Sequence, residues 1–194
     1  LEDEDLVLGL DYQGEHKAYP VKILNWHEVV NDRVIVTYSA LCGSAAAFKS
    51  EAKWGVSGRL KQGCLMMYNR DNSKLVSQID NELEQMPIQV LTWGEWQRAH
   101  PATLVLSVKT GFDRDYMDPY PELKEAEVVY RVRVGEETKT YALEEVKQET
   151  ANDGVWVDTV GGEKIRLSYS QGEILVENLK TKQRIIPLRQ FRPL

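Results

Sequence analysis

The sequence predicts a β-rich α+β protein: a single domain over residues 1–194 that is made of two related halves. Three observations favour this class. Runs of alternating or β-branched residues recur along the chain between turns rich in glycine, asparagine and aspartate. One stretch near residues 92–100 carries the signals of a helix. The order of elements in residues 1–120 returns, in weaker form, in residues 121–194.

The composition is that of a folded globular chain. Its 194 residues are 42% hydrophobic and 28% charged, which is enough to build a substantial core. No apolar run approaches the roughly 18 residues that a membrane span needs. The net charge of -6 argues against nucleic acid as a partner, because nucleic-acid binding needs a basic face. The chain opens on Leu1 without the pattern of an export signal, so we expect a trimmed or mature fragment.

The first elements follow from local patterns. Residues 6–12 form an apolar β-type run, Gln13 and Gly14 signal a turn, and residues 15–19 alternate back, which predicts a hairpin. Pro20 suits the first position of a helix, so a short helical turn is expected over residues 20–24. Further strands are predicted at 34–38, 45–48, 54–60 and 65–68.

The clearest helix begins near Thr92. Thr92 and Glu95 have the spacing of a capping box, and Pro101 stops the helix after His100. Trp93 and Trp96 lie three residues apart on one face, which predicts that they pack into the core. A strand is expected at residues 103–108, followed by a loop rich in aromatic, acidic and proline residues at 111–121.

The second half repeats the first. Residues 128–143 align with residues 6–21 without a gap, and residues 165–170 match residues 34–39 after a small insertion around Gly161 and Gly162. We infer a duplicated unit of β-hairpin, short helix and strand. The second copy has no histidine or cysteine, as expected if one copy kept a site and the other became its structural partner.

The candidate site lies between Trp26 and Gly43, which contain one of three histidines and one of two cysteines. His27 and Cys42 flank a strong strand, so both side chains can reach one end of the sheet. They are the candidate catalytic pair, with His27 lowering the pKa of the Cys42 thiol. The two cysteines permit one pairing, Cys42 with Cys64. We expect independent cysteines instead, because a domain of this size needs no staple.

A soft-metal site is the other chemical hypothesis for these residues. Copper or zinc accepts a thiolate from Cys42 and an imidazole from His27, and Met66 or Met67 can add a thioether that suits Cu(I). We take His27, Cys42 and Met67 as the candidate metal ligands. No tight cysteine or histidine spacing supports a closed zinc site.

A binding module without catalysis is the alternative. Residues 110–121 together with Trp26, Trp54 and Tyr68 place aromatic side chains beside polar groups, a composition typical of a cleft for a small molecule or a protein. His27 and Cys42 are then structural. The aromatic residues are equally consistent with a core, and the loop with a solvated connection.

Several motifs resemble one family. They are Lys17-Ala18-Tyr19-Pro20, Asn25-Trp26-His27-Glu28-Val29-Val30-Asn31-Asp32, Val36-Thr37-Tyr38, Leu41-Cys42-Gly43, Trp93-Gly94-Glu95-Trp96, His100-Pro101, Thr110-Gly111-Phe112 and Arg114-Asp115-Tyr116. Over residues 6–120, and more faintly beyond, the chain resembles domain of unknown function family 3179. The resemblance implies an exported or lipid-anchored prokaryotic protein, hence a periplasmic or cell-surface location, and it implies no reaction.

The chain departs from that family at one loop. Family members carry Cys-Pro-Leu-Cys-Gly, where this chain has Ser39-Ala40-Leu41-Cys42-Gly43. Ser39 cannot resolve a mixed disulfide, so dithiol exchange is not expected unless Cys64 reaches Cys42 in space. A Ser39→Cys change is expected to place a second thiol beside Cys42.

Overall fold

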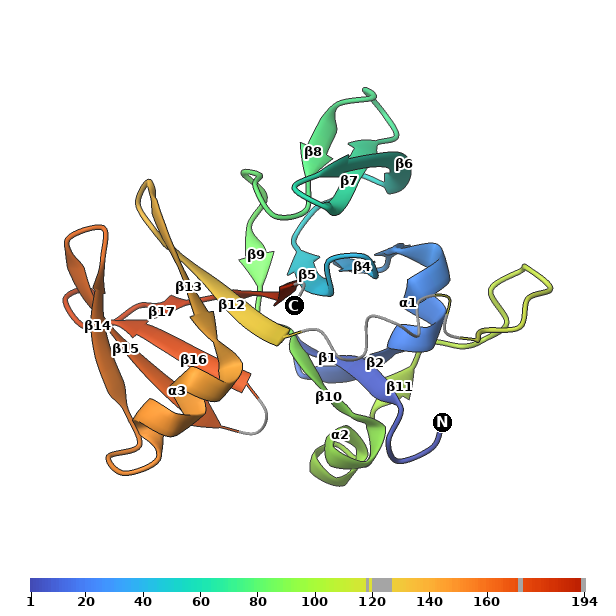
Figure 1. The fold of residues 1–194 in the computed structure, drawn as a ribbon. Helices are drawn as coiled ribbons and strands as arrows, with labels where there is room; N and C mark the ends of the chain where they lie inside the picture. Colours follow the sequence, from blue (N-terminus) through green and yellow to red (C-terminus); the bar gives the residue numbers. More distant parts are fainter. Residues whose placement is uncertain (118, 120–126, 171–172, 193–194) are drawn as a thin grey trace. The chain divides into compact units, whose positions relative to one another are not determined.

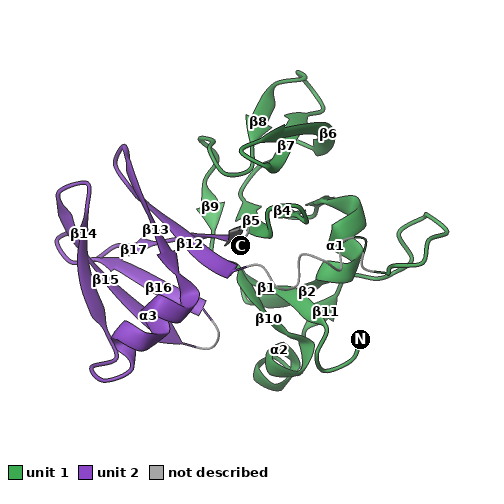
Figure 2. Cartoon of the chain, viewed as in Figure 1, with its two compact units in different colours: residues 1–124 green, residues 125–194 purple. Residues whose placement is uncertain are grey.

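The structure is a computed structural model that describes residues 1–117, 119, 127–170 and 173–192. The chain forms two compact units, residues 1–124 and residues 125–194 (Figure 2). Strands dominate both units, and the described residues contain three helices, so the β-rich α+β class is confirmed. Among these residues, no helix has the length and apolar character needed to cross a membrane.

Unit 1 begins with the predicted hairpin (Figure 1). β1 (Leu6–Tyr12) and β2 (Glu15–Pro20) are antiparallel, and the turn residues Gln13 and Gly14 both have positive φ. β10 (Gln89–Thr92) pairs with β1, and β11 (Leu104–Val105) pairs in parallel with β2. The strand expected at 103–108 is therefore only two residues long.

The segment after the hairpin brings His27 to the end of a helix. α1 (Val21–His27) follows Pro20 directly and extends one turn beyond the expected end, burying Val21, Ile23 and Leu24. β3 (Val29–Asn31), β4 (Ile35–Ser39) and β5 (Ser44–Phe48) then form an antiparallel set, and β9 (Gln85–Met86) pairs with β5. The predicted strands at 34–38 and 45–48 are thus confirmed to within one residue.

One face of β4 and β5 is wholly apolar, and the other carries buried polar residues beside Ile35, Ala46 and Phe48. Val36, Tyr38, Ala45 and Ala47 belong to the core of unit 1. Because successive side chains of a strand alternate in direction, the neighbouring buried polar residues point to the opposite face. These are Thr37, Ser39 and Ser44.

A separate antiparallel arm covers the face that carries these polar residues. It consists of β6 (Trp54–Lys61), β7 (Cys64–Asn69) and β8 (Leu75–Ser77), and we call residues 54–77 the arm. The amide of Asn31 bonds both the backbone N–H and the carbonyl of Trp54. At the other end, Ser39 Oγ accepts the Leu65 N–H at 3.1 Å. Just after β8, Gln78 donates to Thr37 and to the Ser44 carbonyl.

α2 (Trp93–Ala99) has the predicted capping box. Thr92 Oγ1 accepts the Glu95 N–H, and the Glu95 carboxylate accepts the Thr92 N–H at 3.0 Å. Trp96 is buried, as predicted, and forms a small core with Val7, Ala18 and Leu91. Its indole N–H donates to Thr103.

Unit 2 has its own core and its own sequence of elements. β12 (Glu127–Val134) and β13 (Glu137–Ala142) form a hairpin, α3 (Leu143–Thr150) follows, and β18 (Leu188–Arg192) pairs with β12. β14 (Trp156–Val160), β15 (Glu163–Ser170), β16 (Glu173–Asn178) and β17 (Arg184–Ile185) form a second antiparallel set.

A Lys-Tyr-Asp cluster occurs among the described residues of each unit: an aspartate accepts from a lysine and a tyrosine that lie two residues apart on the second hairpin strand. In unit 1, Asp32 Oδ2 lies 2.7 Å from Lys17 Nζ and 3.0 Å from Tyr19 Oη. The corresponding residues of unit 2 are Lys139, Tyr141 and Asp158. In both clusters the other aspartate oxygen accepts the N–H of the following residue.

Candidate functional site

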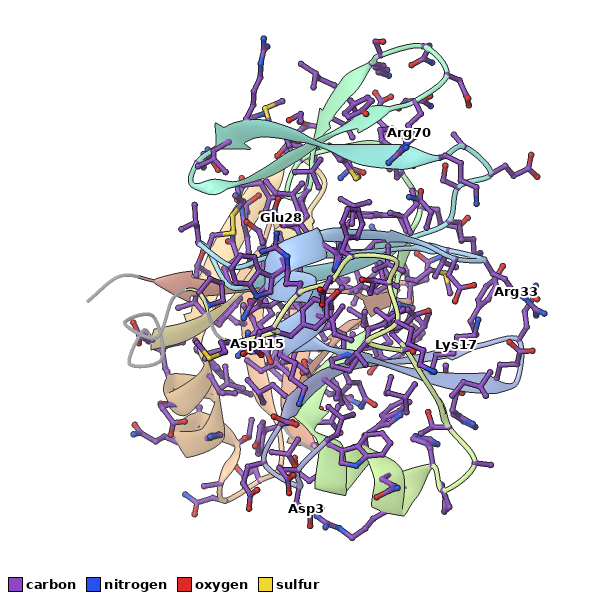
Figure 3. The ribbon with its side chains drawn as sticks, turned by 90° about the vertical axis from the view of Figure 1, so that its right-hand side faces the viewer. Asp3, Lys17, Glu28, Arg33, Arg70 and Asp115 are labelled. Carbon is purple, nitrogen blue, oxygen red and sulfur yellow. A yellow bond between two sulfur atoms is a disulfide. The ribbon has the colours of Figure 1, made fainter. Side chains whose placement is uncertain are left out.

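The two cysteines form a disulfide. Cys42 lies in the turn between β4 and β5, and Cys64 is the first residue of β7; their Cα atoms are 5.3 Å apart. The disulfide is the yellow bond in Figure 3. The expectation of two independent cysteines is therefore wrong. The two cysteines meet because the arm returns to the end of β4 and brings Cys64 against a turn 22 residues earlier in the chain.

The disulfide changes what Cys42 can do. A nucleophile or a thiolate ligand needs a free thiol, and Cys42 has none while it is bonded to Cys64. Both cysteines are buried, and Cys42 is 8% exposed. Met67 is fully buried in β7. Within the described part of the chain, no three histidine, cysteine or acidic side chains are placed to hold a metal ion. The chemistry proposed for Cys42 would therefore require a reduced protein.

His27 contacts residues 110–117, a segment that does not include Cys42. As the last residue of α1, it places its imidazole Nε2 2.7 Å from Tyr116 Oη. Tyr116 Oη lies in turn 2.5 Å from Thr110 Oγ1, so three side chains form one hydrogen-bonded row. The Phe112 ring also packs against His27, with ring centroids 5.5 Å apart.

Trp26 holds the same segment from the neighbouring position of α1. Its indole N–H donates to the Met117 carbonyl at 2.9 Å. The Arg114 guanidinium lies over the Trp26 ring, with its carbon 4.2 Å from the ring centroid. Adjacent helix residues thus hold an irregular segment at several points between Phe112 and Met117. We define the Trp26/His27 site as the six residues Trp26, His27, Phe112, Arg114, Tyr116 and Met117.

This site exposes apolar surface at three of its six residues. Trp26 is 39% exposed, Phe112 66% and Met117 67%. Aromatic residues, methionine and arginine are the side chains most enriched at recognition surfaces. The site therefore has the composition of a contact surface, and its contacts to α1 hold it in place.

The surroundings of His27 favour the neutral form of its imidazole. Burial lowers the pKa of His27, and the positive charge of Arg114 lowers it further. Next to it, burial raises the pKa of the Glu28 carboxyl. Glu28, labelled in Figure 3, ends α1 with φ 54°, and its carbonyl accepts the Tyr38 N–H at 2.8 Å. This bond to β4 fixes the backbone just after His27.

The lowered pKa of His27 implies that the stability of the folded chain depends on pH. A histidine whose pKa is lower in the folded state disfavours folding once the unfolded state binds a proton, so stability is lost as pH falls below the ordinary value of 6.5. We expect the free energy of unfolding, measured by urea titration, to decline from pH 7 to pH 5. His27→Gln should decline less steeply. Equal slopes for both proteins would contradict the environment described for His27.

The other predicted aromatic residues do not join this site. Trp54 is buried, and its indole N–H donates to Ser50. Tyr68 belongs to the arm, where its ring covers Gly55. Residues 118, 120 and 121 of the expected loop lie outside the described residues. The sequence indicated both Trp26 and this loop, but it contained no signal that His27 would contact Tyr116 rather than Cys42.

One family model matches this chain. It is the model for the protein of unknown function family DUF3179, and it matches residues 1–190. No curated protein and no solved structure matches the chain. The match covers nearly the whole sequence and includes the motifs around His27, Cys42 and Trp93. The chain therefore belongs to the DUF3179 family of proteins of unknown function.

Proposed function

We propose that this chain is a non-catalytic, extracytoplasmic binding module that recognises a small organic ligand through the Trp26/His27 site. The observation that carries the proposal is the attachment of residues 110–117 to α1 through both Trp26 and His27. Side chains that are already held in place lose little conformational entropy on binding. The exposed rings of Phe112 and Trp26 then offer apolar area, and the surrounding polar groups offer hydrogen bonds.

The proposal is tested by mapping where small molecules bind. We expect a mixture of ring-containing fragments to shift backbone NMR signals of residues 26, 27 and 110–117 more than signals elsewhere. Phe112→Ala removes the most accessible aromatic ring of the site, so it should weaken these shifts. Val157→Ala, at an exposed apolar residue of unit 2, is the matched control and should leave them unchanged. Shifts confined to other regions would contradict the proposal.

The extracytoplasmic location is supported by the disulfide. Such bonds persist in oxidising compartments and are rare in the reducing cytosol of mesophiles. The test is alkylation of unfolded protein immediately after cell lysis. We expect Cys42 and Cys64 to escape alkylation unless a reductant is added first. Two alkylated cysteines without reductant would place the protein in a reducing compartment.

The soft-metal and thiol hypotheses predict a different result for the same residues. Because Cys42 is bonded to Cys64, we expect no reaction of the folded, unreduced chain with a thiol reagent. Titration with Zn²⁺ or Cu⁺ should show no tight binding by calorimetry. Stoichiometric binding that is lost in His27→Gln would restore a metal site at His27.

We also propose that the two units arose by duplication, so that unit 2 is a structural partner without a site. The support is the gap-free alignment of the two hairpins and the Lys-Tyr-Asp cluster in each unit. In each unit a later strand, β10 in unit 1 and β18 in unit 2, pairs antiparallel with the first strand of the hairpin. The alignment ends at Val21 and Leu143; continued without a gap it places Glu149 opposite His27, and the sequence of unit 2 contains no histidine.

The duplication predicts matched effects of matched substitutions. Asp32→Asn and Asp158→Asn each weaken charge-assisted bonds to a lysine, together with a bond to a tyrosine. We expect each to lower the free energy of unfolding by on the order of 1 kcal/mol, because both carboxylates are partly exposed. Thermal or urea unfolding measures both. A loss in one unit with no loss in the other would contradict equivalent roles.

A further inference from the structure

Arg114 is positioned to bind an anion. Its guanidinium covers the face of Trp26, and stacking of this kind leaves the N–H donors at the edge of the guanidinium plane available. Among the described residues, no carboxylate lies within ion-pair distance of Arg114, although the chain has a net charge of -6. A guanidinium edge matches the two oxygens of a carboxylate in a bidentate pair.

The neighbouring groups restrict which anion fits. Asp113 and Asp115 flank Arg114 in the chain and are exposed, and no second cation belongs to the Trp26/His27 site. Repulsion from these carboxylates grows with the charge of the ligand, so a monoanion is favoured over a dianion such as phosphate. The exposed Phe112 ring supplies a surface for a flat apolar body beside the charge.

We propose that the Trp26/His27 site binds small aromatic carboxylates, with the carboxylate on the Arg114 edge and the ring against Phe112. This inference rests on the proposed function and names the ligand class of the same site. It assigns Arg114 the role of anion receptor and Phe112 the role of stacking surface. Trp26 orients Arg114 from the helix side.

Binding of a carboxylate should be linked to the protonation of His27. The groups that face His27 are Arg114 and Tyr116 from residues 110–117, with Glu28 next to it in the chain. A bound carboxylate offsets the charge of Arg114, which removes one cause of the lowered pKa of His27. By reciprocity, aromatic carboxylates should bind more tightly as pH falls through the His27 pKa.

The experiment titrates the full chain with benzoate and follows the NMR signals of residues 26, 27 and 110–117, including the indole N–H signal of Trp26. We expect a Kd on the order of 1 mM, in keeping with a small ligand on an open surface. Benzamide, which has the same ring without the charge, should bind at least about tenfold more weakly. Phosphate and benzyltrimethylammonium should bind no better than benzamide.

Two charge-removing variants separate binding from general electrostatics. Arg114→Gln should weaken benzoate binding by about tenfold or more, because the bidentate pair is lost. Lys109→Gln, an exposed cation nearby in the sequence, should change it less than about twofold. The titration midpoint of His27 should rise when benzoate saturates the wild type and should not respond to benzoate in Arg114→Gln.

The results separate a failure of the carboxylate assignment from a failure of the proposed ligand-binding function. Equal binding of benzoate and benzamide at these residues would overturn the carboxylate assignment and leave a ligand-binding site. Phosphate binding as tightly as benzoate would overturn the role of the aromatic ring. If no ring compound shifts signals of the Trp26/His27 site, the proposed function fails as well.

Discussion

Replacing both cysteines by serine is expected to lower the free energy of unfolding by about 3 kcal/mol. The disulfide closes a loop with a sequence separation of 22, and removing it gives the unfolded chain more conformations to lose on folding. Urea unfolding monitored by tryptophan fluorescence measures the effect for Cys42→Ser/Cys64→Ser. Reductant should destabilise the wild type by a similar amount and leave the double variant unaffected. An unchanged midpoint would contradict a structural role for the disulfide.

The loss of stability in the Cys42→Ser/Cys64→Ser variant should be concentrated in the arm. Residues 54–77 are held to the rest of unit 1 at Trp54 and near Cys64, and the disulfide is the covalent part of the second attachment. We therefore expect faster amide hydrogen exchange in β6, β7 and β8 of the double variant than in β1 and β2. Exchange that rises equally in all strands would point to global unfolding instead.

Gly9→Ala should destabilise unit 1 by about 1–3 kcal/mol, the usual cost of overfilling a packed core. A Cβ at Gly9 would lie 2.4 Å from two ring atoms of Trp96, which is only 1% exposed. The ring can move only by disturbing α2 and its indole bond to Thr103. Thermal unfolding measures the loss.

A double-mutant cycle assigns the loss to the ring. Trp96→Phe leaves a smaller ring beside Gly9, so Gly9→Ala should cost less in that background than in the wild type. If the Trp96 ring were not the cause, the losses of stability from Gly9→Ala and Trp96→Phe would add. Simple addition would mean that the Ala side chain is accommodated by backbone movement, and the close packing of Trp96 on β1 would then not be the cause.

Local patterns predicted much of the fold. The hairpin expected at residues 6–19, the helical turn expected to start at Pro20 and found to start one residue later, and the capping box at Thr92 each depend on residues close in sequence. Such signals act over a few residues, so one sequence suffices to read them. The strand expected at 103–108 was too long because only Leu104 and Val105 pair with β2.

The site depends on contacts between distant residues, and the sequence could not supply them. His27 and Tyr116 are 89 residues apart, and Trp26 and Met117 are 91 apart. Cys64 reaches Cys42 only because the arm returns to β4. The sequence showed that His27 and Cys42 flank one strand, but flanking a strand does not decide which partner each side chain meets.

The central claim is that ligand binding depends on the Trp26/His27 site, whereas Cys42 and Cys64 form a structural disulfide. The most direct test compares benzoate binding by the wild type and by folded Cys42→Ser/Cys64→Ser, followed through the NMR signals of residues 26, 27 and 110–117. The account predicts the same Kd within about twofold, because the disulfide lies in a different set of contacts. Loss of binding in the cysteine variant, with residues 110–117 still in their folded positions, would contradict it and place Cys42 in the site.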